Sequence, residues 1–212
     1  IVVCAIYTFS VYFGMKGVQL SAATCTWLFF GLLAYVFFFG GQTRFIIEEG
    51  ITALGNLTQN FIGLATWTDS LRTSSFPQTW TIFYWAYWMV WCVAVPFFIG
   101  SISKGRTLRQ VILGGYVFGL SGTFTSFIIM GNYGLGLQMH GKLDVLSTYA
   151  ADGNLYHAIL DILGQLPLSK AVLVLLVLSM ITFYSTSFDS ITIVASTYTY
   201  KELKSDEEPH RN

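Results

Sequence analysis

Long uncharged stretches separate short charged clusters along this 212-residue chain. No Asp, Glu, Lys or Arg occurs in the stretches 17–43, 73–103, 110–141 and 171–188. Each of them can hold the roughly 20 apolar residues that cross a bilayer as an α-helix. Together with an apolar N-terminal segment, the pattern predicts transmembrane helices at about 1–14, 24–40, 80–100, 111–133 and 170–200.

Three segments between these spans have a different character. Residues 45–66 place apolar side chains at near-helical spacing among acidic and amide side chains, which is typical of an amphipathic helix lying on the membrane surface. Residues 134–169 are expected to form a long outer loop with one amphipathic helix near 155–163. A short connector is expected at 15–23.

The composition places the chain in a membrane. Hydrophobic residues make up 54% of the chain and charged residues 10%, against about a quarter charged in soluble domains. We therefore expect an all-α, polytopic helix bundle surrounded by membrane lipid. The formal net charge of +0 argues against binding to nucleic acid, and no Ser/His/Asp, HExxH or glycine-rich phosphate motif suggests an enzyme.

Basic residues indicate the orientation, because short cytoplasmic loops are enriched in Lys and Arg. Alternation of the spans puts Lys16, the basic loop 104–109 and the tail near 201–204 on one side. We expect this side to be cytoplasmic, in a multi-pass protein of the plasma or inner membrane, with both long loops outside. The chain begins without Met inside an apolar segment, so we expect it to be part of a longer protein.

Aromatic rings crowd the span at 80–100. At about 100° per residue, one narrow face carries Trp80, Tyr84, Tyr87 and Trp91. Trp88 lies on the shoulder of this face, and Trp85 is turned farther away. A quaternary ammonium cannot donate a hydrogen bond, so a protein binds it with ring faces, each worth roughly 0.5–2 kcal/mol. From the residues alone, an aromatic cage for such a cation and an ordinary packing stripe both remain open.

The span at 170–200 carries a polar stripe within about a third of the helix circumference. Its members are Ser179, Thr182, Thr186, Asp189 and Ser190. For any one hydroxyl, a bond back to its own backbone or to a neighbouring helix is the ordinary explanation. Asp189 is a candidate functional residue, because an ionisable group at membrane depth is unfavourable and usually faces a cavity or a partner.

Four segments resemble the signature of the betaine/choline/carnitine transporter family. They are WTIFYWAYW at 80–88, ISKGRTLR at 102–109, LPLS at 166–169 and FYSTSFDS at 183–190. The resemblance implies a secondary transporter of trimethylammonium solutes with twelve transmembrane helices, ten of them in two inverted repeats of the LeuT type. This chain would supply the sixth to tenth helices, and the substrate would lie near mid-membrane at the repeat interface.

By position, the resemblance also assigns roles to the aromatic residues. The cage around the quaternary ammonium would be made by Tyr87, Trp88 and Trp91. The approach or gate would be lined by Trp80, Phe83 and Trp85. Many family members have Trp where this chain has Tyr87, so the smaller ring face implies a shift in substrate preference.

In sodium-coupled members the tenth helix supplies ligands to a sodium site, and the matching positions here are Phe183, Thr186 and Ser187. The hydroxyls of Thr186 and Ser187 are hard oxygen ligands, which suit Na⁺. Sodium-independent exchangers instead carry an Arg on the seventh helix, where this chain has Cys25.

The sequence therefore predicts Na⁺-coupled symport of glycine betaine, choline or carnitine. Sodium-independent exchange within the same family is one alternative, and a channel or structural membrane subunit is the other. The resemblance also implies a homotrimer, and no cofactor is expected besides the coupling ion.

Overall fold

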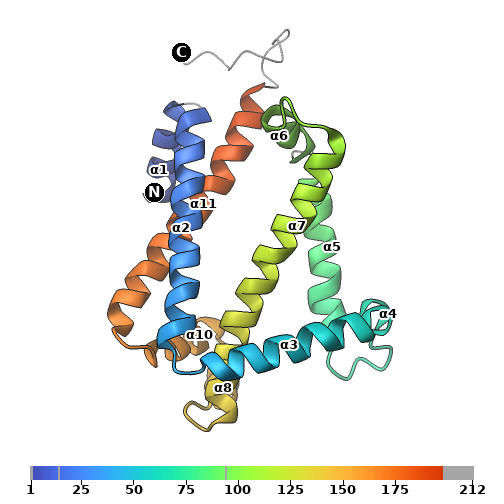
Figure 1. Ribbon diagram of the computed structural model, residues 1–212, viewed down its shortest axis with the longest axis vertical. Helices are drawn as coiled ribbons and strands as arrows, with labels where there is room; N and C mark the ends of the chain where they lie inside the picture. Colours follow the sequence, from blue (N-terminus) through green and yellow to red (C-terminus); the bar gives the residue numbers. More distant parts are fainter. Residues whose placement is uncertain (1, 14, 94, 198–212) are drawn as a thin grey trace.

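The computed structural model describes residues 2–13, 15–93 and 95–197. Within them the chain is a bundle of helices without a β-strand (Figure 1). In chain order the elements are α1 (Val2–Tyr12), α2 (Met15–Phe39), α3 (Thr43–Gln59), α4 (Phe61–Thr66), the π-helical turn η1 (Pro77–Thr81), α5 (Ile82–Trp91), α6 (Val95–Ile102), α7 (Leu108–Ser126), the π-helical turn η2 (Phe127–Gly131), α8 (Asn132–Met139), α9 (Val145–Asp152), α10 (Leu155–Gly164) and α11 (Ser169–Thr197).

Three stretches of helix are long and apolar enough to cross a membrane. They are Lys16–Phe39, Ser169–Ser196 and Leu108–Met139, which joins α7, η2 and α8. The predicted all-α class is confirmed, and the three long apolar helices agree with a multi-pass membrane protein.

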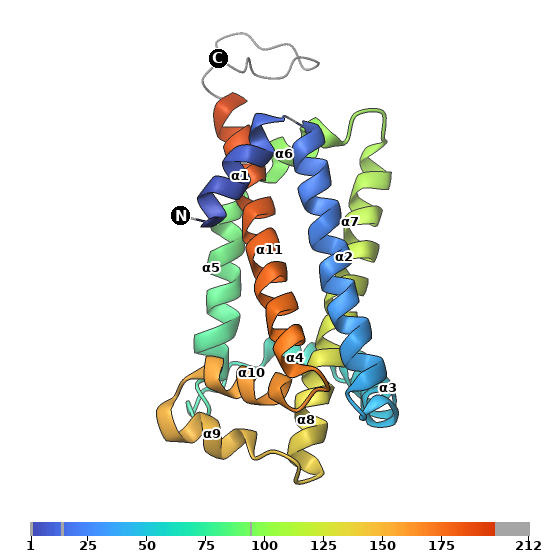
Figure 2. The same ribbon diagram turned by 90° about the vertical axis from the view of Figure 1, so that its left-hand side faces the viewer.

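One end of the molecule is densely packed. There α3 lies across the ends of α2 and the α7–α8 stretch, and α10 packs against α11 (Figures 1 and 2). The buried residues of this region, named here the packed corner, are Leu32, Val36, Ile46, Tyr133, Leu137, Leu163, Leu166 and Val172. Gly40 makes close packing possible, because a Cβ built there would lie 2.7 Å from the Tyr133 ring.

The opposite side is open. Helices α5 and α7, named here the open side, stand apart from α2 and α11 (Figure 1). Neither α5 nor α7 contains a buried residue. By contrast, α1, α2 and α11 pack against one another along their lengths.

The expected connector at 15–23 is wrong, because α2 already begins at Met15. Its polar residues do not interrupt the helix, since the Thr24 hydroxyl donates to the Leu20 carbonyl oxygen at 2.8 Å. Such a bond back to the backbone satisfies the hydroxyl inside the helix. Lys16 lies in the first turn, where a long basic side chain can extend toward the membrane surface.

Two other segments differ from their predicted form. The surface helix expected at 45–66 is divided at Asn60 into α3 and α4. The expected outer loop at 134–169 is mostly helical and holds the end of α8, all of α9, and α10 where the amphipathic helix was predicted. Side-chain oxygens of Asp144 and Asn154 cap the N-termini of α9 and α10, which stabilises short helices in a polar segment.

The span expected at 80–100 is two helices with a break between them. Helix α5 ends at Trp91, and α6 begins at Val95 with Pro96 in its first turn. Proline has no N–H to donate to the carbonyl four residues earlier, and its ring crowds that carbonyl, which favours a kink or a break of the helix near Cys92. Before α5, the Ile82 N–H bonds to the Pro77 carbonyl oxygen, five residues back, which forms the wide turn η1.

The spans predicted at 111–133 and 170–200 can also be compared with helices of the structure. The first begins earlier, at Leu108, and continues through η2 to Met139. The second corresponds to α11, and residues 198–200 lie outside the described part of the chain.

The N-terminal end of α2 and the loop between α6 and α7 lie at one end of the molecule, named here the basic end (Figure 1). Lys16 in the first turn of α2, Lys104 and Arg106 in the loop, and Arg109 in the first turn of α7 therefore belong to the same end. This arrangement agrees with the predicted alternation of the spans. The assignment of the basic end to the cytoplasm stays a prediction.

Candidate functional site

A loop stabilised by one carboxylate leads into the aromatic helix. Asp69, Arg72 and Ser75 have left-handed φ angles of 46°, 52° and 54°, which non-glycine residues rarely adopt. The Asp69 carboxylate accepts hydrogen bonds from the backbone N–H groups of Thr73, Ser74 and Ser75 at 2.8–3.1 Å, and from the Thr73 and Ser74 hydroxyls. These bonds hold the strained loop in place.

Burial of the Asp69 carboxylate raises its pKa, but the hydrogen bonds from Ser74, Thr73 and Ser75 outweigh burial. They hold the pKa at about 2, below its ordinary 3.8. The charged form of Asp69 is therefore the one that this loop stabilises.

The rings of α5 form a connected row centred on Tyr87. The ring centroid of Tyr87 lies 6.1 Å from that of Phe83, 6.0 Å from that of Trp88 and 5.9 Å from that of Trp91. The Trp88 ring is turned by 84° and the Trp91 ring by 50° from the Tyr87 plane. Three rings in different planes can present their faces to one small cation from several directions.

Three of these rings line a cavity of about 430 Å³, named here the aromatic pocket. Its wall brings α2, α5, α6 and α11 together. From α5 come Tyr87, Trp88 and Trp91, and from α11 come Phe183, Thr186, Ser187 and Ser190. The predicted cage residues and the predicted sodium ligands, nearly 100 positions apart in the chain, thus share one cavity.

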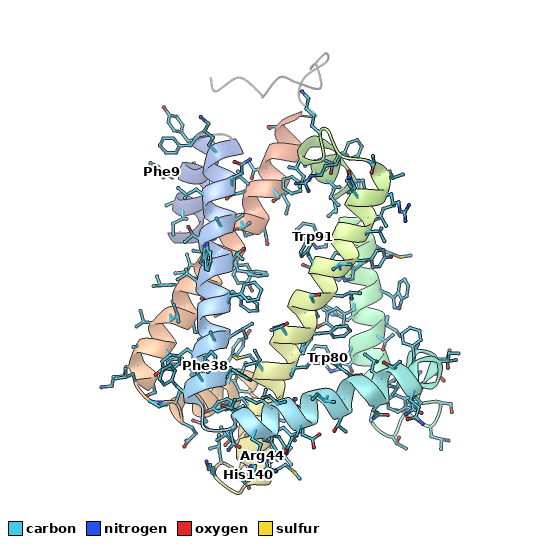
Figure 3. The ribbon with its side chains drawn as sticks, viewed as in Figure 1. Phe9, Phe38, Arg44, Trp80, Trp91 and His140 are labelled. Atoms are coloured by element: carbon cyan, nitrogen blue, oxygen red, sulfur yellow. The ribbon has the colours of Figure 1, made fainter. Side chains whose placement is uncertain are left out.

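The remaining candidate residues do not line this pocket. Phe83 contacts the rings of Tyr84 and Tyr87, and Trp80 stacks on Tyr84 at the other end of the aromatic segment from Trp91 (Figure 3). Trp85 is turned outward with 70% of its surface exposed. Trp80 precedes the end of η1, whose wide turn shifts the helical phase, so a uniform 100° per residue does not describe its direction.

Asp189 is fully buried on α11 but is not among the residues of the aromatic pocket. Two other polar residues of α11, Ser179 and Ser185, are also buried. These three residues therefore lie in the interior of the bundle, on the helix that packs against α1 and α2.

The hydroxyl groups at the predicted sodium positions have defined hydrogen bonds. Thr186 Oγ1 donates to the Thr182 carbonyl oxygen at 2.9 Å, and Ser187 Oγ donates to the Phe183 carbonyl oxygen at 3.2 Å. Because the hydrogens point to the helix backbone, oxygen lone pairs are left for a cation. Ser21 Oγ of α2 lies 3.3 Å from Thr186 Oγ1, a neighbour that the sequence pattern did not indicate.

A second cavity of about 980 Å³ adjoins the aromatic pocket toward the basic end. The two cavities share Ala22, Phe98, Thr186 and Ser190 as lining residues. Sequence analysis missed Phe98, because it lies beyond the helix break, and gave Ser190 no separate role. The position of Ser190 in the polar stripe of α11 was the only sequence signal that this residue lines a cavity.

The fold and the site define a class of protein, namely a polytopic helical membrane protein with a cavity between its helices that is lined by aromatic rings and hydroxyls. The chain belongs to the betaine/carnitine/choline family of transporters, whose family model matches residues 1–212. This finding confirms the resemblance of the four sequence segments.

Named relatives agree with this assignment. The chain is 29% identical over 212 residues to a carnitine transporter of Acinetobacter baumannii, covering 99% of this chain and 38% of the relative. It is 30% identical over 199 residues to a probable glycine betaine transporter of Desulfitobacterium hafniense, covering 93% of this chain and 39% of the relative. The chain thus spans less than two fifths of the length of these proteins, whose names are those of transporters and not of enzymes.

Proposed function

We propose that the protein is a secondary transporter for a trimethylammonium solute such as glycine betaine, carnitine or choline, driven by Na⁺. The observation that carries the proposal is the aromatic pocket, where Tyr87, Trp88 and Trp91 share one cavity with the hydroxyls of Thr186 and Ser187. The names of the relatives, a carnitine transporter and a probable glycine betaine transporter, support this class of solute.

The pocket suits the proposed solute in size and chemistry. Its volume of about 430 Å³ lies within the roughly 300–1,000 Å³ of small-molecule sites. A trimethylammonium group offers no N–H, so hydrogen-bond acceptors give no advantage, whereas each ring face contributes roughly 0.5–2 kcal/mol. The tilted planes of the three rings allow their faces to surround the methyl groups.

Na⁺ is proposed as the second substrate, held by the oxygens of Thr186 and Ser187 with Phe183 beside them. If bound Na⁺ raises the affinity for the solute, the solute must raise the affinity for Na⁺ by the same factor. Sodium-independent exchange is the alternative that keeps the same pocket. In an exchanger, the charge of an arginine would take the place of the ion. In this chain the position of that arginine holds Cys25, which lines the pocket.

Uptake by the full-length protein in proteoliposomes tests the proposal. Radiolabelled glycine betaine, carnitine and choline are each supplied with and without an inward Na⁺ gradient. Accumulation that requires the gradient supports symport, whereas uptake that needs internal solute and no Na⁺ supports exchange. If none of the three solutes is accumulated, the protein is not this transporter, and a channel or structural role becomes the better explanation.

A single substitution tests the ring-lined site. Trp88→Leu keeps apolar bulk but removes the ring face, so the apparent affinity for the solute should fall by roughly 2-fold to 30-fold. Trp85→Leu is the matched control, because Trp85 does not line the aromatic pocket. Equal affinities in both variants would exclude Trp88 from the site.

The ion assignment has its own test. The double substitution Thr186→Ala with Ser187→Ala removes two oxygen ligands and should raise the apparent KM for Na⁺. Ser179→Ala, also on α11 but outside the aromatic pocket, serves as the control. Unchanged sodium dependence in the double variant would show that Na⁺ binds elsewhere.

We also propose that the full-length protein resides in the plasma or inner membrane as a homotrimer, as the family resemblance implies. Light scattering of the purified protein in detergent measures its mass. A monomeric mass at working concentrations would contradict the trimer.

A further inference from the structure

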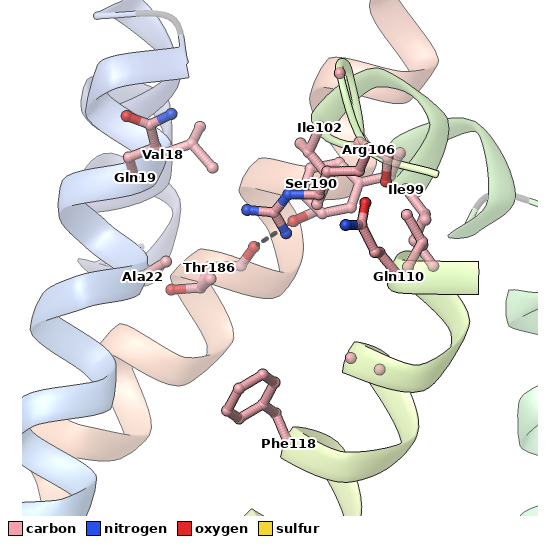
Figure 4. Close-up of a pocket in the computed structure, with 16 residues that line it drawn as sticks. Val18, Gln19, Ala22, Ile99, Ile102, Arg106, Gln110, Phe118, Thr186 and Ser190 are labelled. Carbon is pink, nitrogen blue, oxygen red and sulfur yellow. Dashed lines mark hydrogen bonds between the residues drawn. The ribbon is translucent and has the colours of Figure 1, made fainter. Parts of the chain in front are cut away.

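An arginine faces the cavity at the basic end. The 980 Å³ cavity, named here the arginine pocket, lies between α2, α6, α7 and α11. Figure 4 shows the guanidinium of Arg106 extending from the loop before α7 to a point beside Ser190 of α11. Arg106 forms no ion pair with any residue that the structure describes. Its five N–H donors are therefore open to a ligand in the cavity.

The other lining residues favour an anion at this place. Arg106 is the sole charged residue among those that line the arginine pocket, and none of them is acidic. Gln110 adds a polar group, since its Oε1 accepts from the Thr107 N–H at 3.0 Å and its amide nitrogen points into the cavity (Figure 4). Most of the remaining wall is apolar, and a charge attracts its partner more strongly beside an apolar wall than in open water.

The arginine pocket and the aromatic pocket form one path. They share Ala22 on α2, Phe98 on α6, and Thr186 and Ser190 on α11. A solute that moves from the rings toward the basic end through these two pockets therefore comes to the wall that holds Arg106. A trimethylammonium group matches the rings at the start of this path, and a carboxylate matches the guanidinium at its end, where it can accept two parallel hydrogen bonds.

We propose that Arg106 recognises the carboxylate of the transported solute, and that the protein therefore prefers trimethylammonium carboxylates over the cation choline. This inference rests on the proposed function and narrows its substrate class. Choline carries the same trimethylammonium group but no anion, so it gains nothing from Arg106 and is repelled by its charge. Lys104 in the same loop and Arg109 in the first turn of α7 add to this repulsion.

Glycine betaine and choline make a matched pair of probes, because they differ only in a carboxylate or a hydroxymethyl group on the same trimethylammonium carbon chain. Their binding to the full-length protein in detergent is followed by tryptophan fluorescence, and their uptake is followed in proteoliposomes. In Arg106→Gln, betaine affinity should fall roughly tenfold or more, as expected for the loss of charge-assisted hydrogen bonds. Choline affinity should stay equal or rise. Arg106→Lys, which keeps the charge but not the planar fork, should recover part of the betaine affinity.

Arg109→Gln is the control for a general loss of loop charge, because Arg109 does not line the arginine pocket. An unchanged ratio of betaine to choline affinity in Arg106→Gln would overturn the proposal, and so would an equal fall for both solutes, which indicates a structural role. In either case, a retained effect of Trp88→Leu leaves the proposed function intact. If the wild-type protein binds neither solute, the proposed function fails, and this inference fails with it.

Discussion

The packed corner and the open side are both rich in apolar side chains, yet they are packed in opposite ways. In the corner, Tyr133 keeps 1% of its surface exposed, whereas Trp88 on α5 keeps 62%. Within a bilayer, lipid is as apolar as leucine, so hydrophobicity alone does not drive a helix against its neighbours. The corner is held by close shape fit at glycines such as Gly40. The open side keeps its rings available to whatever occupies the cavities beside them.

A cavity made in the packed corner should have the largest effect. Leu163 on α10 is 1% exposed, so Leu163→Ala should lower the free energy of unfolding by about 2–5 kcal/mol. Val117→Ala on the open side removes apolar atoms from a residue that is 57% exposed, and its effect should stay within about 0.5 kcal/mol. Denaturant titration in detergent measures both. Equal losses would mean that the two regions are packed alike.

Adding one methyl group to each region should give a smaller difference. Gly40→Ala places a Cβ 2.7 Å from the Tyr133 ring and 2.5 Å from the Val36 carbonyl oxygen, which should destabilise the fold by about 1–3 kcal/mol. Gly115→Ala on α7 meets no atom within 4 Å and should be neutral or slightly stabilising, since Ala suits a helix better than Gly. Thermal unfolding compares the two variants. A loss at Gly115 as large as at Gly40 would show that another segment packs on this face.

The smallest and most local effect is expected in the Asp69 loop, which leads into α5 of the open side. Hydrogen bonds to a carboxylate stabilise this loop instead of an apolar core. Its folded-state pKa of about 2 lies below the ordinary 3.8, so its stabilising contribution is complete above about pH 4 to 5 and is lost as the pH falls toward 2. The protection of the Thr73–Ser75 amides against hydrogen exchange, measured relative to the intrinsic exchange rate at each pH, should therefore fall over this range. In Asp69→Asn, exchange should already be fast at pH 6 and should lose this additional acid dependence. Slow exchange at these amides in Asp69→Asn would contradict the assigned role of the carboxylate.

The sequence was most informative where one physical rule dominates. Long uncharged stretches predict membrane helices, and the aromatic and hydroxyl stripes were visible as patterns along α5 and α11. The rule that charges mark helix ends misplaced the start of α2, because Lys16 fits within its first turn. Pro96 was expected to kink a helix, but the complete break before it depends on the local backbone.

The site could be predicted only in part, for two reasons. A uniform helical period cannot anticipate the wide turn η1, which changes the direction of Trp80. Nor does any local pattern reveal that Tyr87 and Thr186 share a cavity, or that Arg106 faces the same path, because these are tertiary relations between distant segments. The family resemblance supplied the grouping of the cage and ion residues, whereas Ser21 and Phe98 emerged only from the structure.

The interruption between α5 and α6 has a consequence for the solvent of the cavity. Pro96 offers no N–H to the Cys92 carbonyl, so that peptide dipole must find a donor outside its own helix. Hydrocarbon supplies none, and irregular backbone at membrane depth is therefore confined to places that meet protein or water. Val95 and Phe98 put this break on the wall of the aromatic pocket. A hydrogen-bond donor from protein or water inside the cavity is thus a condition for the helix to stay interrupted.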